Sequence, residues 1–404
     1  VNDEYIEELI QKRKKLFSVL RIYLSQFASL ITALNWQSPS IKSSKNTRIG
    51  IEKSAIEADW NDYKRDRSSD TFFCEDLLKD NLFLSTGTGV TPVLNIFNSG
   101  MGAFASIIYF LICEEIVTNK VIAYAQNYVE NRMLLKKFFK DSLETFDYND
   151  TESIVNNILK TKPNAIFLEP LSNTNNLRLI DVVEIVRKVA EVYGDEIYFI
   201  LDVTCIVGFE NLFDNYEIPK NIKIILHGSI LKSPQLGLER VNAGFVQTFG
   251  LGNLSDKILD YRTLSGTNIQ DFATNLLPLT TKELLRNRMQ SIEDNARDLA
   301  EYTSIIDTDG EIFSEIVYPG IKSHKDFETS VKLGFAGTFF NIKFIEGLNN
   351  DKYFELYVSE IIKTAKKYNC DLVHGASFGF NQTSIYYSVG WDEPENHYIR
   401  ISTG

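Results

Sequence analysis

Three short apolar runs in the middle of the chain are each followed directly by residues that can do chemistry. The segments after these runs are Glu169-Pro-Leu-Ser-Asn173, Asp202-Val-Thr204 and His227-Gly-Ser-Ile-Leu-Lys232. A fourth apolar stretch ends in Ser99-Gly-Met-Gly102, where a helix is predicted to begin. Because ligands bind at the carboxyl ends of parallel strands, the sequence predicts one edge that gathers carboxylates, hydroxyls, an amine and a glycine-rich helix N-terminus.

This set of side chains has a chemical use. A glycine-rich turn into a helix presents free N–H groups and the positive end of the helix dipole, which suits a phosphate. A lysine can form a Schiff base with an aldehyde, and a carboxylate can keep a pyridinium nitrogen protonated, as pyridoxal phosphate requires. Taken singly, Asp202 is more often a cap or turn residue, and a lone Lys232 would be a surface residue. The ordered occurrence of the whole set favours the cofactor site.

The elements that must position these residues follow from hydrophobic periodicity. Four apolar runs have the length of buried strands, namely Val121–Tyr124, Ala165–Leu168, Tyr198–Leu201 and Ile222–Leu226. Between two of them, apolar residues recur at helical spacing from Leu179 to Tyr193, and Gly194 stands at the expected C-cap. Strands alternating with amphipathic helices predict βαβ units and a mainly parallel sheet.

The remaining segments suggest how the chain is divided. Residues 1–35 have the pattern of an amphipathic helix, and residues 36–67 are polar and lack helical periodicity. A long helical pattern from Lys282 to Tyr302 precedes looser strands and helices. We therefore expect an N-terminal helix and arm over 1–60, a cofactor-binding domain over 61–270 and a small C-terminal α+β domain over 271–404.

Composition excludes several classes of protein. The 404 residues carry 42 Lys plus Arg against 54 Asp plus Glu, a net charge of −12, which disfavours a nucleic-acid partner. The longest apolar run, Met101–Cys113, is too short to cross a membrane and suits a buried helix. Four scattered cysteines and histidines without metal-ligand spacing predict buried thiols in a reducing, cytoplasmic setting and no metal site.

Several of these motifs, taken together, resemble a known family. Over residues 60 to 404 the chain is similar to the fold-type I pyridoxal-phosphate enzymes of cysteine and methionine metabolism, which include cystathionine γ-synthase, cystathionine lyases and methionine γ-lyase. The matching segments, in family order, are Tyr63-Lys-Arg65, Ser99–Ala103, Val121–Tyr128, Glu169–Asn173, Asp202-Val-Thr204, Ser229-Ile-Leu-Lys232, Ser377-Phe-Gly379 and Arg400–Gly404.

The resemblance implies a role for each matched residue. Around the phosphate we expect Ser99, Gly100, Met101 and Ser229, joined by Tyr63 and Arg65 from a neighbouring subunit. Around the ring we expect Tyr128 stacked on it, Asn173 near its phenolic oxygen, Asp202 with Thr204 at its nitrogen, and Lys232 as the Schiff-base lysine and general base. For the substrate carboxylate we expect Ser377 and Arg400. The resemblance also implies a homodimer or homotetramer with shared active sites, acting on a small amino acid.

The sequence departs from the family on the substrate side. Leu231 replaces a phosphate-binding threonine, residues 233–240 replace the usual stretch after the lysine, and Val129-Glu130-Asn131 replace glycines, which would bring Glu130 close to the substrate. An atypical substrate for β- or γ-elimination or γ-replacement is the favoured interpretation. Two alternatives stay open: another reaction on the same cofactor, such as transamination or decarboxylation, and a degenerate homologue that serves as a binding scaffold.

Overall fold

A computed structural model describes residues 3–33, 69–82, 92–147, 150–208, 213, 216–249, 253–274, 276–278, 280–307, 310–388 and 397–404. The chain forms two compact units, Val1–Ser69 and Asp70–Gly404. Tyr63, Arg65 and the predicted polar arm lie outside the described residues. The predicted domain limits at residues 60 and 270 stay predictions.

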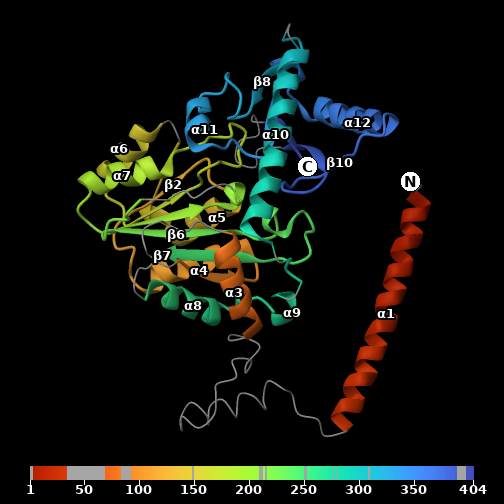
Figure 1. Cartoon of the computed structure of the whole chain (residues 1–404), viewed down its shortest axis with the longest axis horizontal. Coiled ribbons are helices and arrows are strands. Elements are labelled where there is room, and N and C mark those ends of the chain that lie inside the picture. The colour runs from red at the N-terminus through yellow and green to blue at the C-terminus, as the bar shows by residue number, and fades with distance from the viewer. Residues whose placement is uncertain are drawn as a thin grey trace. The chain divides into compact units, whose positions relative to one another are not determined.

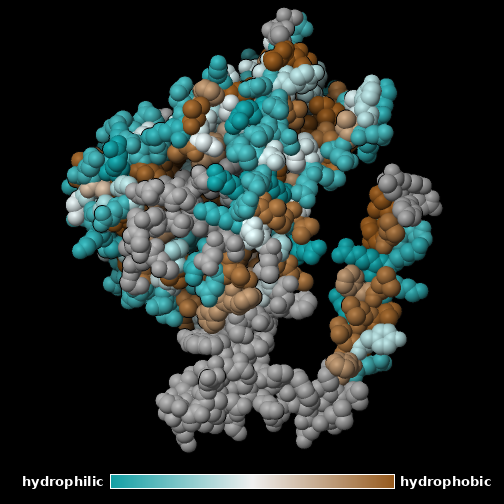
Figure 2. Space-filling model, in the orientation of Figure 1, coloured by the Kyte–Doolittle hydropathy of each residue, from teal (hydrophilic) through white to brown (hydrophobic). Residues whose placement is uncertain are grey.

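The described part of the first unit is one long helix, α1 (Asp3–Ala33), as the amphipathic pattern predicts. Large apolar side chains between residues 6 and 27 are exposed along it, including Ile10, Phe17 and Leu24. Figure 2 shows these residues in brown beside charged ones in teal. None of the described helices is long and apolar enough to cross a membrane.

The second unit is built on a seven-stranded sheet in the order β1-β7-β6-β5-β4-β2-β3. Strands β6, β5, β4, β2 and β3 are parallel, whereas β7 runs antiparallel to both β1 and β6. The strands are β1 (Pro92–Phe97), β2 (Val121–Tyr124), β3 (Leu143–Phe146), β4 (Ala165–Leu168), β5 (Ile197–Asp202), β6 (Ile222–Ser229) and β7 (Gly244–Phe249). The four runs predicted as strands are β2, β4, β5 and β6, so this prediction is confirmed.

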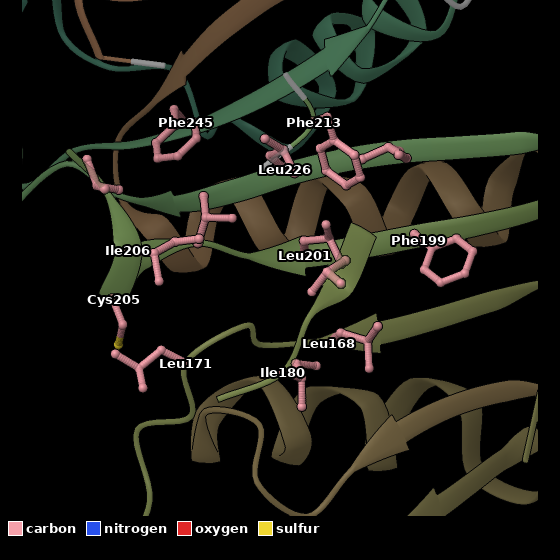
Figure 3. Packing of buried hydrophobic residues seen from close by; sticks show 14 of the residues in the cluster. Leu168, Leu171, Ile180, Phe199, Leu201, Cys205, Ile206, Phe213, Leu226 and Phe245 are labelled. Atoms are coloured by element: carbon pink, nitrogen blue, oxygen red, sulfur yellow. The ribbon is translucent and has the colours of Figure 1, made fainter. Parts of the chain in front are cut away.

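Helices cover both faces of this sheet (Figure 1). The helices are α3 (Ser69–Leu82), α4 (Gly100–Cys113), α5 (Val129–Phe139), α6 (Thr151–Thr161), α7 (Val182–Val192), α8 (Leu254–Ser265) and α9 (Asp271–Thr274). One face packs against α4, α5 and α8, and the other packs against α3, α6, α7 and the start of α10 (Lys282–Ile306). Along β5, Phe199 and Leu201 point to one face and Tyr198 and Ile200 to the other, as a strand buried on both sides requires. Figure 3 shows the hydrophobic cluster on the face covered by α3, α6, α7 and the start of α10, with Leu168, Leu201 and Leu226 contributed by adjacent strands.

A smaller five-stranded sheet follows, in the order β10-β11-β12-β9-β8. It is antiparallel except for the pair β10–β11. Its strands and helices are β8 (Phe313–Val317), α11 (Phe327–Leu333), β9 (Phe339–Phe344), α12 (Asp351–Lys367), β10 (Leu372–His374), β11 (Thr383–Ser388) and β12 (Tyr398–Ser402). The described residues also include four short 3-10 helices, η1 (Lys140–Ser142), η2 (Thr204–Ile206), η3 (Ser233–Gln235) and η4 (Glu346–Leu348). The mixed α/β fold of the fold-type I enzymes, with its smaller C-terminal α+β part, is thus confirmed.

Two local predictions are wrong. Helix α7 ends at Val192, and Tyr193 is its cap with an extended backbone, so Gly194 is not a left-handed C-cap. The Tyr193 hydroxyl donates to the Pro163 carbonyl at 2.9 Å, which turns the chain toward the sheet instead. Cys74 and Cys205 are buried as predicted, but Cys113 and Cys370 are exposed: Cys113 is the last residue of α4, and Cys370 lies three residues beyond the end of α12.

Candidate active site

The sheet topology brings the predicted site segments to one edge. Strand β1 is parallel to β6, because both are antiparallel to β7. The carboxyl ends of β1, β6, β5, β4 and β2 therefore lie at the same edge, beside the first residue of β7, Gly244. A side chain at Gly244 would lie 2.3 Å from the Ser99 carbonyl oxygen, so only glycine lets the turn into α4 rest on this strand.

Asp202 lies at the end of β5 and is held on both of its carboxylate oxygens. Its Oδ1 accepts hydrogen bonds from the backbone N–H and the hydroxyl of Thr204, at 3.1 and 2.7 Å. Its Oδ2 accepts one from Nδ2 of Asn131 at 2.9 Å. The Thr204 hydroxyl oxygen also accepts from the Ser229 N–H at 3.0 Å, which joins the ends of β5 and β6. This arrangement fixes a half-buried carboxylate at the edge of the sheet.

The turn Ser99–Met101 meets the end of β6 at the same edge. Ser99 is the N-cap of α4, and its hydroxyl oxygen accepts from the Gly102 N–H at 2.9 Å. A Cβ on Gly100 would lie 3.3 Å from Cα of Ser229, so the two segments are in contact. The structure thus brings together Ser99, Gly100, Met101 and Ser229, the four expected phosphate ligands of this subunit.

Lys232 lines a cleft of about 510 Å³. The other lining residues are Glu239, Val373, Gly375, Ala376, Ser377, Phe380, Gln382 and Ser384. The lysine Nζ donates to the Ser377 hydroxyl at 2.6 Å and lies 5.3 Å from the centre of the Phe378 ring. Burial lowers the pKa of Lys232, which the charges of Glu239 and Glu130 partly oppose. Lowering this pKa enlarges the fraction of neutral amine, the form that acts as a nucleophile or base.

Tyr128 and Glu130 form a pair beside this lysine. Tyr128 is the N-cap residue of α5, and Glu130 lies in the first turn of that helix. Burial, followed by a hydrogen bond between the two side chains, raises the pKa of the Tyr128 hydroxyl. Tyr128 therefore keeps its proton at neutral pH, and the exposed Glu130 carboxylate accepts a hydrogen bond from it.

Arg400 is buried in the middle of the smaller sheet, with 2% of its surface exposed. Its cross-strand neighbour Asn341 accepts a hydrogen bond from Nε at 2.9 Å, and the Asn173 side chain accepts one from Nη1. The guanidinium lies 4.5 Å from the centre of the Phe339 ring. Asn173 is thus brought to Arg400, whose Nη2 also donates to the Thr174 carbonyl and to the Tyr398 hydroxyl, each at 3.4 Å, so that a substrate carboxylate would have to replace these long hydrogen bonds.

The segment that carries Asn173 is tied to the smaller sheet on its other side. Arg178 donates to both carboxylate oxygens of Asp326, from Nε at 2.7 Å and from Nη2 at 2.9 Å. The Leu179 N–H donates to the same carboxylate at 2.9 Å. A buried bidentate pair of this kind fixes geometry, and so it holds Asn173 and Arg400 in register.

Two buried groups complete the edge. Glu169 accepts a hydrogen bond from the Cys205 thiol at 3.7 Å, and burial, reinforced by the charge of Asp202, raises its pKa well above the ordinary value. His227 lies against Phe104 with ring centres 5.1 Å apart, and burial lowers its pKa. His227 is therefore a neutral histidine packed at the end of β6.

Sequence reasoning missed three residues that organise the site. Asn131 was seen only as a replaced glycine, Asn341 is the polar residue inside the apolar run 339–342, and Gln235 is a fully buried amide in the loop after Lys232. A lone polar residue in a predicted strand is a signal that could have identified Asn341. Nothing in the sequence pattern distinguishes Gln235 from a surface loop residue.

A sequence profile of the Cys/Met metabolism PLP-dependent enzymes matches residues 42–352. The chain belongs to this family. Its cofactor is therefore pyridoxal 5'-phosphate, as the motifs predict. The residues present fit that group, since a glycine-rich helix start, a fixed carboxylate and a lysine of lowered pKa lie around one sheet edge and its cleft.

Individual relatives are more distant. The chain is 26% identical over 344 residues to the bifunctional enzyme flvA of Aspergillus flavus, across 85% of this chain and 40% of that protein. The chain thus spans about two fifths of the length of this curated relative.

Solved structures share the fold. Cystathionine gamma synthase from Xanthomonas oryzae pv. oryzae has a TM-score of 0.66 at 14% identity, covering 91% of this chain and 94% of that one. Cystathionine gamma-lyase from Lactobacillus plantarum has a TM-score of 0.65 at 18% identity, covering 87% and 86%. CalE6, a methionine gamma lyase from Micromonospora echinospora, has a TM-score of 0.59 at 16% identity, covering 77% of each chain.

Proposed function

We propose that this protein is a pyridoxal-phosphate-dependent lyase or transferase that eliminates or replaces a β- or γ-substituent of an amino acid. The observation that carries the proposal is Lys232, an amine of lowered pKa on the wall of a cleft, close to the sheet edge that holds Asp202. The names of the related structures, two γ-lyases and a γ-synthase, support chemistry at the γ-carbon.

Each residue then has a defined task. When bound, the cofactor supplies an electron sink for charge that develops at the substrate Cα. Lys232, once its amine is free, takes the proton from Cα, and its lowered pKa suits a general base near neutral pH. Asp202 keeps the ring nitrogen protonated through its negative charge. The Tyr128 hydroxyl, which its raised pKa keeps protonated, would give a proton to the departing substituent.

The substrate is held from the smaller sheet. Arg400 binds the substrate carboxylate as the bidentate donor that a planar guanidinium provides, and Asn173, which accepts from its Nη1, orients it. Ser377 adds a hydroxyl to the same side of the cleft, next to Lys232. We also expect a homodimer or homotetramer in which Tyr63 and Arg65 complete a neighbouring site, an expectation that rests on the family resemblance.

Absorbance and product release test the proposal together. The purified chain with pyridoxal 5'-phosphate is expected to show a near-visible band. If it catalyses elimination, it releases ammonia, a keto acid and the substituent from homocysteine, cystathionine or O-acylated homoserine. If it catalyses replacement, it releases the substituent while an added thiol takes its place on the amino acid. Lys232→Ala is expected to lose the band and the activity. Lys223→Ala, at the opposite end of strand β6, is the matched control and is expected to keep both.

Other outcomes separate the alternatives. A keto acid formed without release of the substituent indicates transamination, and release of carbon dioxide indicates decarboxylation. Either result contradicts elimination and replacement. A wild-type protein that stays colourless after the cofactor is added supports a binding scaffold and contradicts the proposal altogether.

A further inference from the structure

Asn131 connects a helix to the carboxylate of Asp202. It lies in the first turn of α5, in the segment that replaces the family's glycines, and only 4% of its surface is exposed. Its side-chain Nδ2 donates to Asp202 Oδ2 at 2.9 Å, although the two residues are 71 positions apart. Burying a side-chain amide costs free energy unless its polar atoms are hydrogen-bonded. The hydrogen bond to Asp202 satisfies the Asn131 amide, and so the contact is a specific part of the site.

Counting the hydrogen bonds of Asp202 shows what this contact does. A carboxylate has about four lone-pair positions, two on each oxygen. Thr204 fills two on Oδ1, through its N–H and its hydroxyl. Asn131 fills one on Oδ2. One position on Oδ2 is left for a further donor, and Asn131 on one side and Thr204 on the other fix the plane in which that donor must lie.

We propose that Asn131 is a positioning residue for the cofactor, because it orients Asp202 so that a single lone pair of Oδ2 faces the protonated ring nitrogen. This inference rests on the cofactor contact of Asp202 in the proposed function, and it is independent of which reaction follows. Asn131 also stabilises the negative charge on Asp202 with a neutral donor. A cationic residue in that place would compete with the pyridinium for the same carboxylate.

The surrounding charges make this donor more important. Glu169 is buried near Asp202, and the negative charge of Asp202 contributes to raising the pKa of Glu169. This favours the neutral form of Glu169. The Nδ2 donor of Asn131 binds Asp202 without adding charge to the edge of the sheet.

Cofactor binding measures the role directly, without turnover. We would determine dissociation constants of the full chain for pyridoxal 5'-phosphate and for its analogue with carbon in place of the ring nitrogen. Asn131→Ala is expected to weaken binding of pyridoxal 5'-phosphate about tenfold, as loss of one donor to a charged group does. The near-isosteric Asn131→Asp, which sets a second carboxylate against Asp202, is expected to weaken it about a hundredfold. Both variants are expected to bind the carbon analogue within about twofold of wild type, because the analogue offers Asp202 no N–H donor.

A matched control separates positioning from folding. Asn127 is also buried, with 5% exposed, and its Nδ2 donates to the Phe167 carbonyl at 2.9 Å. Asn127→Asp is expected to lower the thermal stability and to leave the affinity ratio between the two compounds unchanged. If the Asn131 variants lose affinity equally for both compounds, or for neither, the inference is wrong.

The two proposals fail in different ways. A wild-type chain that binds the cofactor but releases no substituent contradicts the proposed function and leaves the Asn131 measurement intact. If Asn131→Asp does not fold, judged by circular dichroism, Asn131→Ala provides the same comparison. A wild-type chain that binds the carbon analogue as tightly as pyridoxal 5'-phosphate contradicts a role for Asp202, and with it the role of Asn131.

Discussion

The edge of the central sheet and the loop after Lys232 flank the same amine but are built in different ways. At the edge, Asp202 and Ser229 end paired strands, and Thr204 links them with hydrogen bonds. The loop of residues 233–241, here called the cleft loop, lies outside the strands of both sheets. The fully buried Gln235 holds its two ends together, because it accepts from the Arg240 and Val241 N–H groups and donates to the Val241 carbonyl.

The backbone of the cleft loop differs in the same sense. Leu236 and Glu239 have positive φ values of 54° and 43°, a region that side chains with a Cβ seldom occupy. Gly237 has a φ of +79°, and a Cβ added at this position would lie 3.0 Å from the Asn381 backbone nitrogen. The difference teaches that the cofactor groups sit on strand ends joined by hydrogen bonds, whereas Glu239, on the wall of the cleft, sits on a loop outside both sheets.

The largest effect is expected for Asp202→Asn, which removes the carboxylate at the edge of the central sheet. The neutral amide cannot favour a protonated ring nitrogen, so turnover is expected to fall about a thousandfold or more, as for loss of a major electrostatic group. Steady-state turnover measures the loss, and the absorbance band and the cofactor dissociation constant show whether the cofactor is still bound. Asp195→Asn, an exposed residue just before β5, is the control. An Asp202→Asn variant with wild-type turnover would show that Asp202 is not the residue that keeps the ring nitrogen protonated.

A smaller loss is expected for Arg400→Lys, which changes the substrate clamp on the second sheet. A lysine cannot make two parallel hydrogen bonds to a carboxylate, so kcat/KM is expected to fall about a hundredfold, mainly through KM. Cofactor affinity is expected to stay close to wild type, because the residue donates to Asn341, Asn173, Thr174 and Tyr398 and not to the groups expected at the ring nitrogen or the phosphate. A parallel loss of cofactor affinity would contradict the assignment of cofactor binding to the central sheet and of substrate binding to the smaller sheet.

The cleft loop itself is tested by Gln235→Ala. Removing this amide leaves the Arg240 and Val241 N–H groups without their acceptor, and the loop is expected to shift. We expect KM to rise about tenfold while the cofactor dissociation constant is unchanged. Steady-state kinetics and cofactor titration on the same preparation give the answer. If the KM and the cofactor dissociation constant rise equally, the cleft loop supports the cofactor as well as the substrate, which contradicts the proposed difference between the loop and the sheet edge.

The smallest effect is expected for Glu239→Gln, and it depends on pH. The Glu239 carboxylate raises the pKa of Lys232, so its removal lowers that pKa further. A larger fraction of the amine is then neutral below the pKa, and cofactor uptake by the apoprotein at pH 7.5 is expected to be about twofold faster, as fits an exposed charge. Stopped-flow absorbance between pH 6.5 and 9 measures this. A slower uptake would mean that Glu239 acts on the substrate and not on the lysine.

Much of the cofactor half could be predicted from local sequence. The strands ending at Leu168, Asp202 and Ser229 are apolar runs, and the rule that ligands bind at their carboxyl ends places the acid and the lysine together. The predictions for Gly194 and for Cys113 and Cys370 failed, because the end of a helix and the burial of a single residue depend on neighbours far away in sequence. The oligomeric role of Tyr63 and Arg65 remains a prediction.

The amino-acid sequence was sufficient for the fold class, the cofactor and the order of the residues that hold it, because periodicity and strand-end motifs are local properties of the chain. It was not sufficient for the partners of those residues. Asn131 reaches Asp202 across 71 residues, and Asn341 reaches Arg400 as a cross-strand neighbour 59 residues away. Such pairs arise only when sheet register and helix packing bring distant side chains within hydrogen-bond distance, and no pattern along one chain records that geometry.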